Sequence, residues 1–494
     1  MEQTFGLVRH GTTTVGGRCG IADDTIRCDV CVVGAGPAGL AAALRLVDLG
    51  RDVCLVAPSP LHGNRRWESL TPGAWKILDA LGLGTALAHA HCLPSHAATV
   101  SWGGREVNRA GHAEITFLID RARFDACLMD AARRRGVRLL TPAVASQPQK
   151  IGGTWLLPVT TSQTTVSLCA AHVIDASGRK ALTGSRRRRL SPATLALCAR
   201  WRGQPAPPGM TTIEATAESW LWSASFADGA HYAAVFVDPR SLRAAGVEPT
   251  AAFLEAVGGS SSRWEGALAS SVTACDASAI RIARAPGFED IIAAGEAALS
   301  LDPLSSQGIQ RALVDGQQSA IVVNTLIVHP ERRDIAVAFH AERQGESSRR
   351  DGAMCHGLYR EQAITYRSPF WSRYCEQGAP PEHKLPSPIP IDSLLPETGL
   401  RLSPRARLED VAVIDSDVIA LAPALVHPDL DRPVAFLAGR SIGSLLARAI
   451  SGVTAASLFD GWQADSLPEG TALELLQWFW QRGLLVDNSA TDAS

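Results

Sequence analysis

The chain has 494 residues and a mass of 52.3 kDa, which is too long for one ordinary domain and fits two or three packed units. Its 47 Lys and Arg nearly balance its 49 Asp and Glu, so a global basic field that would hold nucleic acid is excluded. With 46% apolar and 19% charged residues, the composition is typical of a folded protein and not of a disordered one.

The N-terminal segment and the cysteines bear on location. No run of about 18 apolar residues is present, and residues 1–28 lack the apolar centre of a signal peptide. We therefore predict a flexible leader over 1–28, no membrane segment and a cytoplasmic protein. The 11 Cys are scattered through apolar runs, which indicates buried free thiols. Cys28 and Cys31 have the C-x-x-C spacing, but Cys31 lies in a predicted buried strand. A second candidate group is interrupted by a Leu-Pro-Ser loop, so we interpret it as a solvated loop and predict no metal; it comprises His89, His91, Cys92 and His96.

A glycine-rich turn stands between a predicted strand at 29–33 and an Ala- and Leu-rich helix that ends near Leu49. A second predicted strand follows at 53–56, which completes the strand–turn–helix–strand context of a dinucleotide-binding motif. In such a motif the glycines allow a tight turn, approach of a pyrophosphate and close packing of the helix, whose N-terminus faces the phosphates. The predicted cofactor-binding residues of the turn are Gly34, Gly36, Pro37, Ala38 and Gly39.

One expected feature is missing from this motif. The second strand should end in an acidic residue that binds the ribose, but the position holds Ala57, followed by Pro58. Arg65 or Arg66 is a candidate to hold the ribose instead, and water is the alternative.

The rest of the chain predicts an insertion and a C-terminal unit. Alternating apolar runs such as 220–226 and 232–238 predict an antiparallel sheet. A strand at 290–294 and a long helix to Leu326 then return to the first unit, and a proline-rich stretch begins near residue 378. The basic run Arg186–Arg189 is interpreted as a solvated turn. The predicted units are a nucleotide-binding domain (29–190 and 285–377), a substrate-binding sheet domain (191–284), a linker (378–394) and a C-terminal domain (395–487).

The predicted fold class is therefore α/β, a Rossmann-like nucleotide-binding domain with an inserted antiparallel β-sheet domain. The short strands, three helices and apolar end of the C-terminal domain predict a small winged-helix-like α+β unit.

Several motifs together resemble the FAD-dependent aromatic hydroxylase and tryptophan-halogenase superfamily. Besides the glycine turn, they are the Asp120-Arg121 pair before Phe124-Asp125, the strand end Asp175–Gly178, and the segment from Gly295-Glu296 to Gly308. Finer matches are similar to flavoprotein maturases that oxidise a residue inside another protein to build a quinone cofactor, the lysine-oxidase and quinohemoprotein amine dehydrogenase maturases. These matches are 67–72, 220–223, 235–239, 356–361 and 368–371.

The resemblance implies FAD as cofactor, O₂ as oxidant, and NADH, NADPH or an external flavin reductase as the source of electrons. Glu296 would replace the family's ribityl-binding Asp, and the loop up to Gly308 would lie against the flavin ring. Arg121 would reach the FAD phosphates or the flavin. The further FAD-binding residues implied are Arg66, Arg121, Val144, Gly295, Glu296, Pro303, Ser306, Gly308 and Ile309.

The implied reaction is hydroxylation of a tryptophan side chain in a protein substrate during quinone-cofactor biogenesis, in quinohemoprotein amine dehydrogenase maturation. Trp220 and Trp222 would lie near the substrate, although aromatics that only fill the junction between sheet and domain would give the same pattern. Glu68 and His356 are the candidate acid–base residues.

Three alternatives stay open at this stage. A halogenase would need a relay lysine, and none occurs between Lys76 and Lys150. A small-molecule aromatic hydroxylase would have no need of a C-terminal docking unit. A non-catalytic flavoprotein or a DNA-binding regulator would need a basic recognition helix, whereas the predicted helix at 473–483 is apolar with one Arg.

Overall fold

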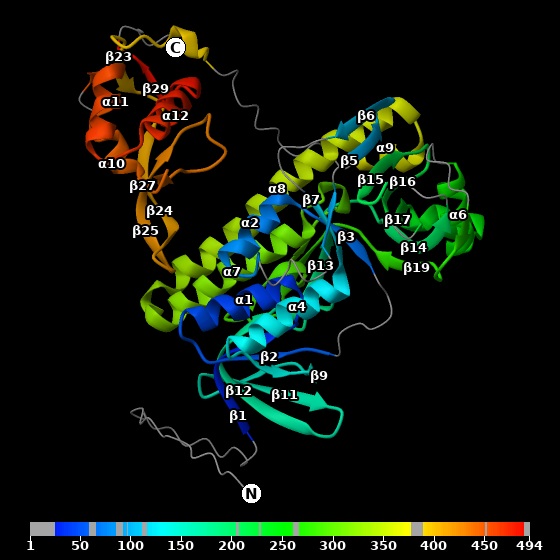
Figure 1. The fold of residues 1–494 in the computed structure, drawn as a ribbon. Coiled ribbons are helices and arrows are strands. Elements are labelled where there is room, and N and C mark those ends of the chain that lie inside the picture. Colours follow the sequence, from blue (N-terminus) through cyan, green and yellow to red (C-terminus); the bar gives the residue numbers. More distant parts are fainter. Residues whose placement is uncertain are drawn as a thin grey trace, which may run out of the picture.

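The computed structural model describes residues 25–58, 66–84, 92–95, 97–110, 116–203, 207–226, 229–259, 266–376, 389–449 and 452–488. Two large sheets with their helices form the body of the molecule, and a smaller C-terminal module stands beside it (Figure 1). This architecture confirms the predicted α/β fold class. None of the described helices has the length and apolarity that a membrane span requires.

The first large sheet has the strand order β10-β11-β12-β1-β2-β8, with β12, β1, β2 and β8 parallel. Alternate residues of β1 and β2 enter different cores, because successive side chains of a strand point to opposite faces. Strand β1 begins at Thr25, so the last four residues of the predicted leader belong to this sheet and the leader prediction is wrong there; the earlier residues lie outside the described ones. The strands are β1 (Thr25–Val33), β2 (Val53–Val56), β8 (Arg138–Leu140), β9 (Ala143–Ala145), β10 (Gln149–Ile151), β11 (Thr154–Thr161), β12 (Thr165–Asp175) and β21 (Ile292–Ala293).

Helices cover one face of this sheet, with α1 packed on α7 and α4, and α7 on α2 and α8 (Figure 1). Nine of the twelve residues of α1 are buried, as expected of its Ala- and Leu-rich sequence. The helices are α1 (Pro37–Asp48), α2 (Pro72–Ala80), α4 (Arg121–Arg134), α7 (Gly308–Val328) and α8 (Arg333–Tyr366), with short 3₁₀ turns η1 (Gly178–Lys180), η2 (Gly295–Ala297), η3 (Pro303–Ser305) and η4 (Pro330–Arg332).

The second large sheet has the order β18-β14-β17-β16-β15-β5-β6, with β19 beside β14. Its pairs are antiparallel except for β15 and β5, so the predicted antiparallel sheet is mixed at one end. Strands β5 and β6 come from the chain before residue 190, which corrects the predicted boundary of the inserted domain. The elements are β5 (Ala97–Trp102), β6 (Arg105–Ala110), β14 (Leu195–Gly203), β15 (Met210–Ala215), β16 (Trp220–Ser225), β17 (Ala230–Val237), β18 (Gly266–Leu268) and β19 (Thr273–Asp276), with α5 (Pro239–Ala245), α6 (Pro249–Gly258) and α9 (Pro369–Cys375) around them.

Two small sheets connect the large ones, in the orders β3-β7-β4 and β13-β20-β22. The basic run predicted as a solvated turn is exposed, as predicted, but it lies in strand β13, paired with β20, and not in a turn. The strands are β3 (Trp67–Leu70), β4 (Leu93–Ser95), β7 (Thr116–Asp120), β13 (Gly184–Arg189), β20 (Ile280–Arg284) and β22 (Leu299–Ser300).

The C-terminal module has its own core of buried apolar residues, and the middle strand of its sheet, β23, lies between β28 and β29. The order α10, β28, α11, α12, β29 is that of a winged helix, with its third strand supplied by β23 from before α10. Residues 389–394 pack on this core, so the end of the predicted linker belongs to the module, while 377–388 lie outside the described residues. The elements are η5 (Ile391–Ser393), β23 (Gly399–Leu402), β24 (Arg407–Asp415), β25 (Val418–Val426), β26 (Phe436–Leu437), β27 (Arg440–Ser441), α10 (Ile442–Leu446), β28 (Val453–Thr454), α11 (Ala455–Ala464), α12 (Glu469–Gln481) and β29 (Leu485–Asp487).

A long hairpin of β24 and β25 attaches the module to the body. At its tip Ile419 is 0% exposed and lies in the main core together with α1 and α7. Its N–H donates to Thr325 Oγ1 at 2.8 Å, and Asn324 Nδ2 donates to the carbonyl of Asp417 at 2.9 Å. Arg45 of α1 forms an ion pair with the Asp417 carboxylate. The hairpin tip is therefore part of the nucleotide-binding body.

Ile419→Ala should lower the free energy of unfolding by about 2–4 kcal/mol, because it leaves a cavity in the main core. Leu421→Ala is the matched control on the same strand, since Leu421 is 57% exposed. The control should change stability by less than about 0.5 kcal/mol. Urea denaturation followed by tryptophan fluorescence measures both, and equal effects of the two changes would contradict the inserted tip.

Candidate functional site

The glycine turn lies between the end of β1 and the start of α1, at the carboxyl end of the parallel strands. Gly34 has φ +113°, and a Cβ on it would lie 2.2 Å from the carbonyl oxygen of Ala176. A Cβ on Gly39 would lie 2.0 Å from the carbonyl oxygen of Gly34. Both positions therefore require glycine for backbone packing alone.

Gly36 is different from its neighbours. A Cβ there would meet only Arg121 Nη2, at 4.0 Å, so space is open in front of the α1 N-terminus. Pro37 occupies the first turn of α1, where its missing N–H costs no hydrogen bond. Free backbone N–H groups and the positive end of the helix dipole then face this space together with a guanidinium, an arrangement that suits a pyrophosphate.

Ala38 is the point where three segments meet. A Cβ on Gly295 of η2 would lie 2.7 Å from Ala38 Cβ, and one on Gly316 of α7 would lie 2.2 Å from the Ala38 carbonyl oxygen. The structure thus brings the predicted Gly295 segment directly against the predicted glycine turn.

Arg121 is the first residue of α4 and is held by two carboxylates. Its Nη1 lies 3.1 Å from Glu68 Oε1, and its Nε lies 2.9 Å from Asp125 Oδ1. Although burial disfavours the charged form, Glu68 and Asp125 raise the pKa of Arg121 above its usual value. The guanidinium is therefore a fixed positive charge beside the open space at Gly36. Glu68, predicted as an acid–base group, is engaged in this ion pair.

The η2 turn is anchored by a buried carboxylate that sequence reasoning did not identify. Gly295 N–H donates to Asp315 Oδ2 at 2.6 Å, and His340 Nε2 lies 3.3 Å from Asp315 Oδ1. Although burial opposes ionisation, the hydrogen bond and charge of His340 lower the pKa of Asp315 below its usual value. The neighbouring Glu296 has a 55% exposed side chain that accepts from Ser300 Oγ at 2.8 Å.

The loop between η3 and α7 is held by Asp302, which caps the 3₁₀ turn by accepting from Leu304 N–H at 3.0 Å. Tyr359 Oη of α8 donates to the same carboxylate at 3.0 Å. Burial raises the pKa of Asp302 to about 6. Ser306 then adopts φ +54°, a left-handed conformation that turns the chain into α7.

The predicted residues of this loop lie between that cap and the first turn of α7: Pro303, Ser306, Gly308 and Ile309. The Asp-Pro pair is a recognisable N-cap signal. No local signal could have assigned Tyr359, which is 57 residues away in the chain.

Trp220 and Trp222 differ in exposure although both belong to β16. Trp220 is 2% exposed, with its ring centroid 3.7 Å from that of Phe236 in a parallel stack. It fills the aromatic core between sheet and helices, which favours the alternative in which this ring only fills the junction, and a substrate role stays a prediction. Trp222 is half-buried, and its ring lies 6.1 Å from that of Tyr232 in an edge contact.

Three predicted residues remain, Arg66, Val144 and His356. Arg66 is exposed, and its carbonyl accepts from Arg121 N–H at 2.9 Å. Val144 is 60% exposed on β9, next to Ala143, whose N–H donates to the carbonyl of Ala57 at 2.8 Å. His356 lies on α8, and among the described residues its buried Nε2 has no hydrogen-bond partner. The cofactor, ribose and acid–base roles of these residues stay predictions.

The residues present fit an FAD. The space at Gly36 lies before a helix N-terminus, Arg121 supplies a charge there, and the η3 loop leads into the N-terminus of the long helix α7. A pyrophosphate and a flavin ring are the groups that such features would hold.

Comparisons with known proteins agree with this geometry. Residues 29–183 match the family described as FAD dependent oxidoreductase. The tryptophan 2-halogenase of Chondromyces crocatus is 27% identical over 217 residues, 40% of this chain and 41% of the relative. The putative FAD-dependent oxidoreductase LodB of Marinomonas mediterranea is 26% identical over 159 residues, 31% of this chain and 43% of the relative. The chain spans less than half the length of the curated relatives it matches.

Two of the similar solved structures match over almost the whole chain. CmlS, described as a flavin-dependent halogenase, is 17% identical with a TM-score of 0.72, over 94% of this chain and 97% of that chain. The other is described as the peptidyl tryptophan dihydroxylase QhpG, essential for tryptophylquinone cofactor biogenesis. The sequence identity is 26%, the TM-score is 0.69, and the match covers 93% of this chain and 100% of that chain.

The two glycines predict different outcomes. Gly36→Val should fold normally and lose bound flavin, because its side chain enters the open space before α1 and displaces only the ligand. Gly39→Val should fail to fold, because its Cβ overlaps the carbonyl of Gly34. Far-UV circular dichroism and visible flavin absorbance of the purified variants separate the cases. A folded, fully yellow Gly36→Val protein would contradict the assignment.

The raised pKa of Asp302, about 6, predicts a pH effect on stability. A carboxyl in an unfolded chain has a pKa of about 3.9, so the folded state binds more protons between the two values and loses stability as pH rises through this window. Asp302→Asn should remove on the order of 2 kcal/mol of this pH-dependent loss of stability. The amide oxygen of the new side chain can still accept from Leu304 N–H. Denaturation midpoints between about pH 4 and 7 measure it.

Asp351 provides the matched comparison, because burial raises its pKa to about 6 as well. Asp351→Asn should likewise reduce the loss of folding stability as pH rises through the same window. An unchanged pH dependence in Asp302→Asn would contradict the buried, protonated carboxyl.

Proposed function

We propose that this chain, whose residues 29–183 match the FAD dependent oxidoreductase family, is an FAD-dependent monooxygenase that hydroxylates a tryptophan side chain within a polypeptide. The observation that carries the proposal is the match to a peptidyl tryptophan dihydroxylase over 93% of this chain and 100% of that one. The product would be a tryptophan on the way to a quinone cofactor, as in quinohemoprotein amine dehydrogenase maturation.

The chain's own residues would first bind and orient the cofactor. The α1 N-terminus and Arg121 would hold the pyrophosphate at Gly36, and the exposed Glu296 is positioned to reach ribityl hydroxyls. When bound and reduced, FAD supplies oxygen activation with electrons from NADH, NADPH or a flavin reductase. One oxygen atom of O₂ would enter the indole ring and the other would leave as water.

Around the flavin ring the chain would provide charge stabilisation and exclude water. Backbone N–H groups at the start of α7, near Gly308, would stabilise negative charge on the ring. Leu304 of η3 packs on the aromatic core that contains Trp220 and Tyr359, so this side of the loop is apolar. Trp222, half-buried on the facing sheet, would seat the substrate indole by edge or face contacts.

An indole ring is electron-rich and needs little activation, but the ring proton must leave after oxygen enters. Glu68 is bound to Arg121 through both carboxylate oxygens, at 3.1 and 3.4 Å, which favours a role in holding Arg121. His356, with an unpartnered Nε2 within the described residues, is the better candidate to accept the proton.

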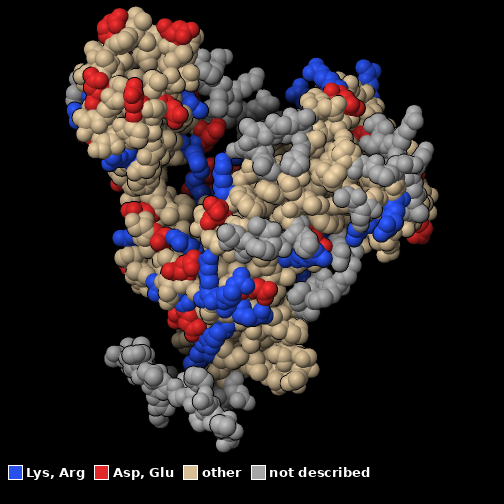
Figure 2. All heavy atoms as spheres, in the orientation of Figure 1, with Lys and Arg blue, Asp and Glu red and all other residues tan. Residues whose placement is uncertain are grey.

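The C-terminal module would help seat the polypeptide. Its helices α11 and α12 carry Asp460, Glu469 and Glu474 and no Lys or Arg, which is unsuited to a nucleic-acid recognition helix. Figure 2 shows Asp and Glu side chains spread over the outer face of the module. These features favour a protein partner over DNA.

The similarity to a tryptophan halogenase makes halogenation the second candidate. Such an enzyme would need a relay lysine beside the flavin, and Lys76, the last lysine before Lys150, is exposed on α2. A small-molecule aromatic hydroxylase is the other candidate, for which the module would have no role in the reaction.

Reduced FAD, O₂ and bromide, supplied with a tryptophan-containing polypeptide, should give mass gains in steps of one oxygen. Gly36→Val is the control that should give none, because it cannot hold the flavin. A bromine isotope pattern in the product would establish halogenation instead. Efficient conversion of free indoles with no conversion of polypeptides would favour the small-molecule hydroxylase.

A further inference from the structure

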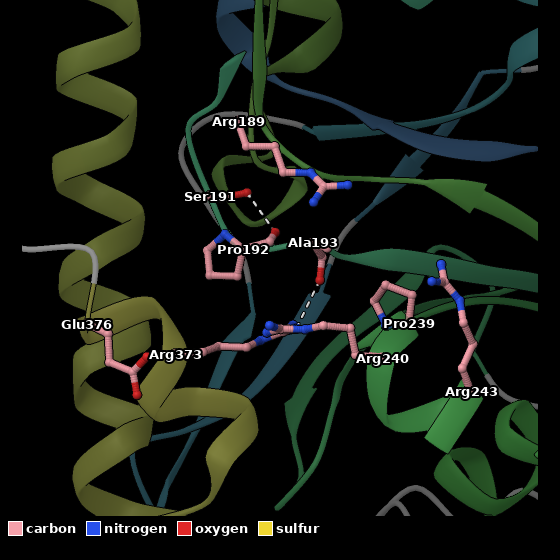
Figure 3. A pocket seen from close by; sticks show the side chains of 9 residues that line it. All are labelled: Arg189, Ser191, Pro192, Ala193, Pro239, Arg240, Arg243, Arg373 and Glu376. Atoms are coloured by element: carbon pink, nitrogen blue, oxygen red, sulfur yellow. Dashed lines mark hydrogen bonds between the residues drawn. The ribbon is translucent and has the colours of Figure 1, made fainter. Parts of the chain in front are cut away.

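A pocket lined by arginines lies away from the glycine turn, where three parts of the fold meet. Its volume is 550 Å³, and it lies between the end of β13, helix α5 and the end of α9 (Figure 3). Four arginines line it, with one acidic residue at its edge: Arg189, Arg240, Arg243, Arg373 and Glu376.

One of these arginines is built into the wall. Arg373 is 7% exposed, its Nη1 lies 2.6 Å from Asp238 Oδ2, and the same atom donates to the carbonyl of Ala193 at 2.9 Å (Figure 3). Although burial opposes ionisation, Arg240 N–H and the Arg373 charge lower the pKa of Asp238. Asp238 therefore compensates part of the charge behind the pocket, and its hydrogen bonds fix the wall.

The other three arginines leave an excess of positive charge at the opening. Arg240 reaches Asp238 only at 3.4 Å and is 68% exposed. Arg189 and Arg243 are exposed, and neither has an ion-pair partner among the described residues. Figure 3 shows these side chains arranged around the space between β13 and α5. Like charges that converge without a counter-ion repel one another, and an anion would relieve that repulsion.

We propose that this arginine pocket binds the phosphates of a ligand that contains a nucleoside diphosphate group. Guanidinium groups match phosphate oxygens in bidentate geometry. The volume exceeds what a lone inorganic anion needs and lies in the range of sites for small organic ligands. Pro192 and Pro239 line the same space and offer apolar surface for a ribose or base. The proposal does not depend on the proposed hydroxylation.

The pocket is connected to the η3 loop by two stacked rings. Arg373 Nη2 donates to Tyr374 Oη at 3.4 Å, and the Tyr374 ring stacks on Tyr359 with centroids 3.6 Å apart. Tyr359 in turn holds Asp302. A nucleotide bound here would lie behind the aromatic layer of the η3 loop and outside the predicted FAD site.

Calorimetric titration of the full chain loaded with FAD tests this, because the bound flavin already fills the first nucleotide site. ADP should bind saturably, and adenosine, which lacks the phosphates, should bind at least about tenfold more weakly. Arg189→Gln combined with Arg243→Gln should weaken ADP binding by more than about tenfold with flavin content unchanged. Arg188→Gln is the matched control, since it removes the same charge one residue away on the opposite side of β13.

Three results would overturn the proposal. Equal affinities for ADP and adenosine would exclude recognition of the phosphates. Undiminished ADP binding by the double variant would place the ligand elsewhere. Saturable binding of a hexa-aspartate peptide with none of ADP would assign the pocket to an acidic polypeptide.

Discussion

Backbone-to-backbone contact around Ala38 is the constraint on which the rest of the structure depends. Helix α1 touches the glycine turn at Gly39, and α7 touches α1 at Gly316, with no room for a Cβ at either position. These contacts fix how η2 and the start of α7 lie relative to the α1 N-terminus. The open space at Gly36 and the η3 loop thus belong to one rigid frame, although about 270 residues of chain separate them.

Two buried carboxylates complete this frame and differ in ionisation because their partners differ. Asp315 faces His340 and holds the η2 turn, and its pKa is lowered despite burial. Asp302 receives only neutral donors, Leu304 N–H and Tyr359 Oη, and burial raises its pKa to about 6. A hydroxyl and an amide stabilise a carboxylate less than a nearby positive charge does. The loop nearest the proposed flavin ring is therefore held by a carboxyl that is mostly neutral only below about pH 6.

The sequence predicted those parts of the site whose cause is local. The glycine turn follows from spacing and from the flanking apolar strands, and the α1 helix and β2 follow from composition. Trp220 and Trp222 could not be separated, because both occupy the same face of β16 and only their neighbours, Phe236 and Tyr232, decide which ring stays accessible. The joining of β5 to β15 also depends on pairing across more than 100 residues, which no local pattern encodes.

The C-terminal module was expected to be a separable unit behind a linker, and its hairpin shows why it is not. Burial of Ile419 in the core that contains α1 and α7 makes the hairpin tip part of the same packing that positions the glycine turn. The ion pair of Asp417 with Arg45 reaches α1 itself. A module fixed in this way can orient a bound polypeptide relative to the flavin, because its hairpin is anchored on the cofactor domain rather than tethered by residues 377–388 alone. Deleting the module would remove core contacts of α1 and α7 together with any docking surface, so a deletion cannot separate docking from folding. Single substitutions of exposed residues on the module can separate the two effects, because they leave the core contacts intact.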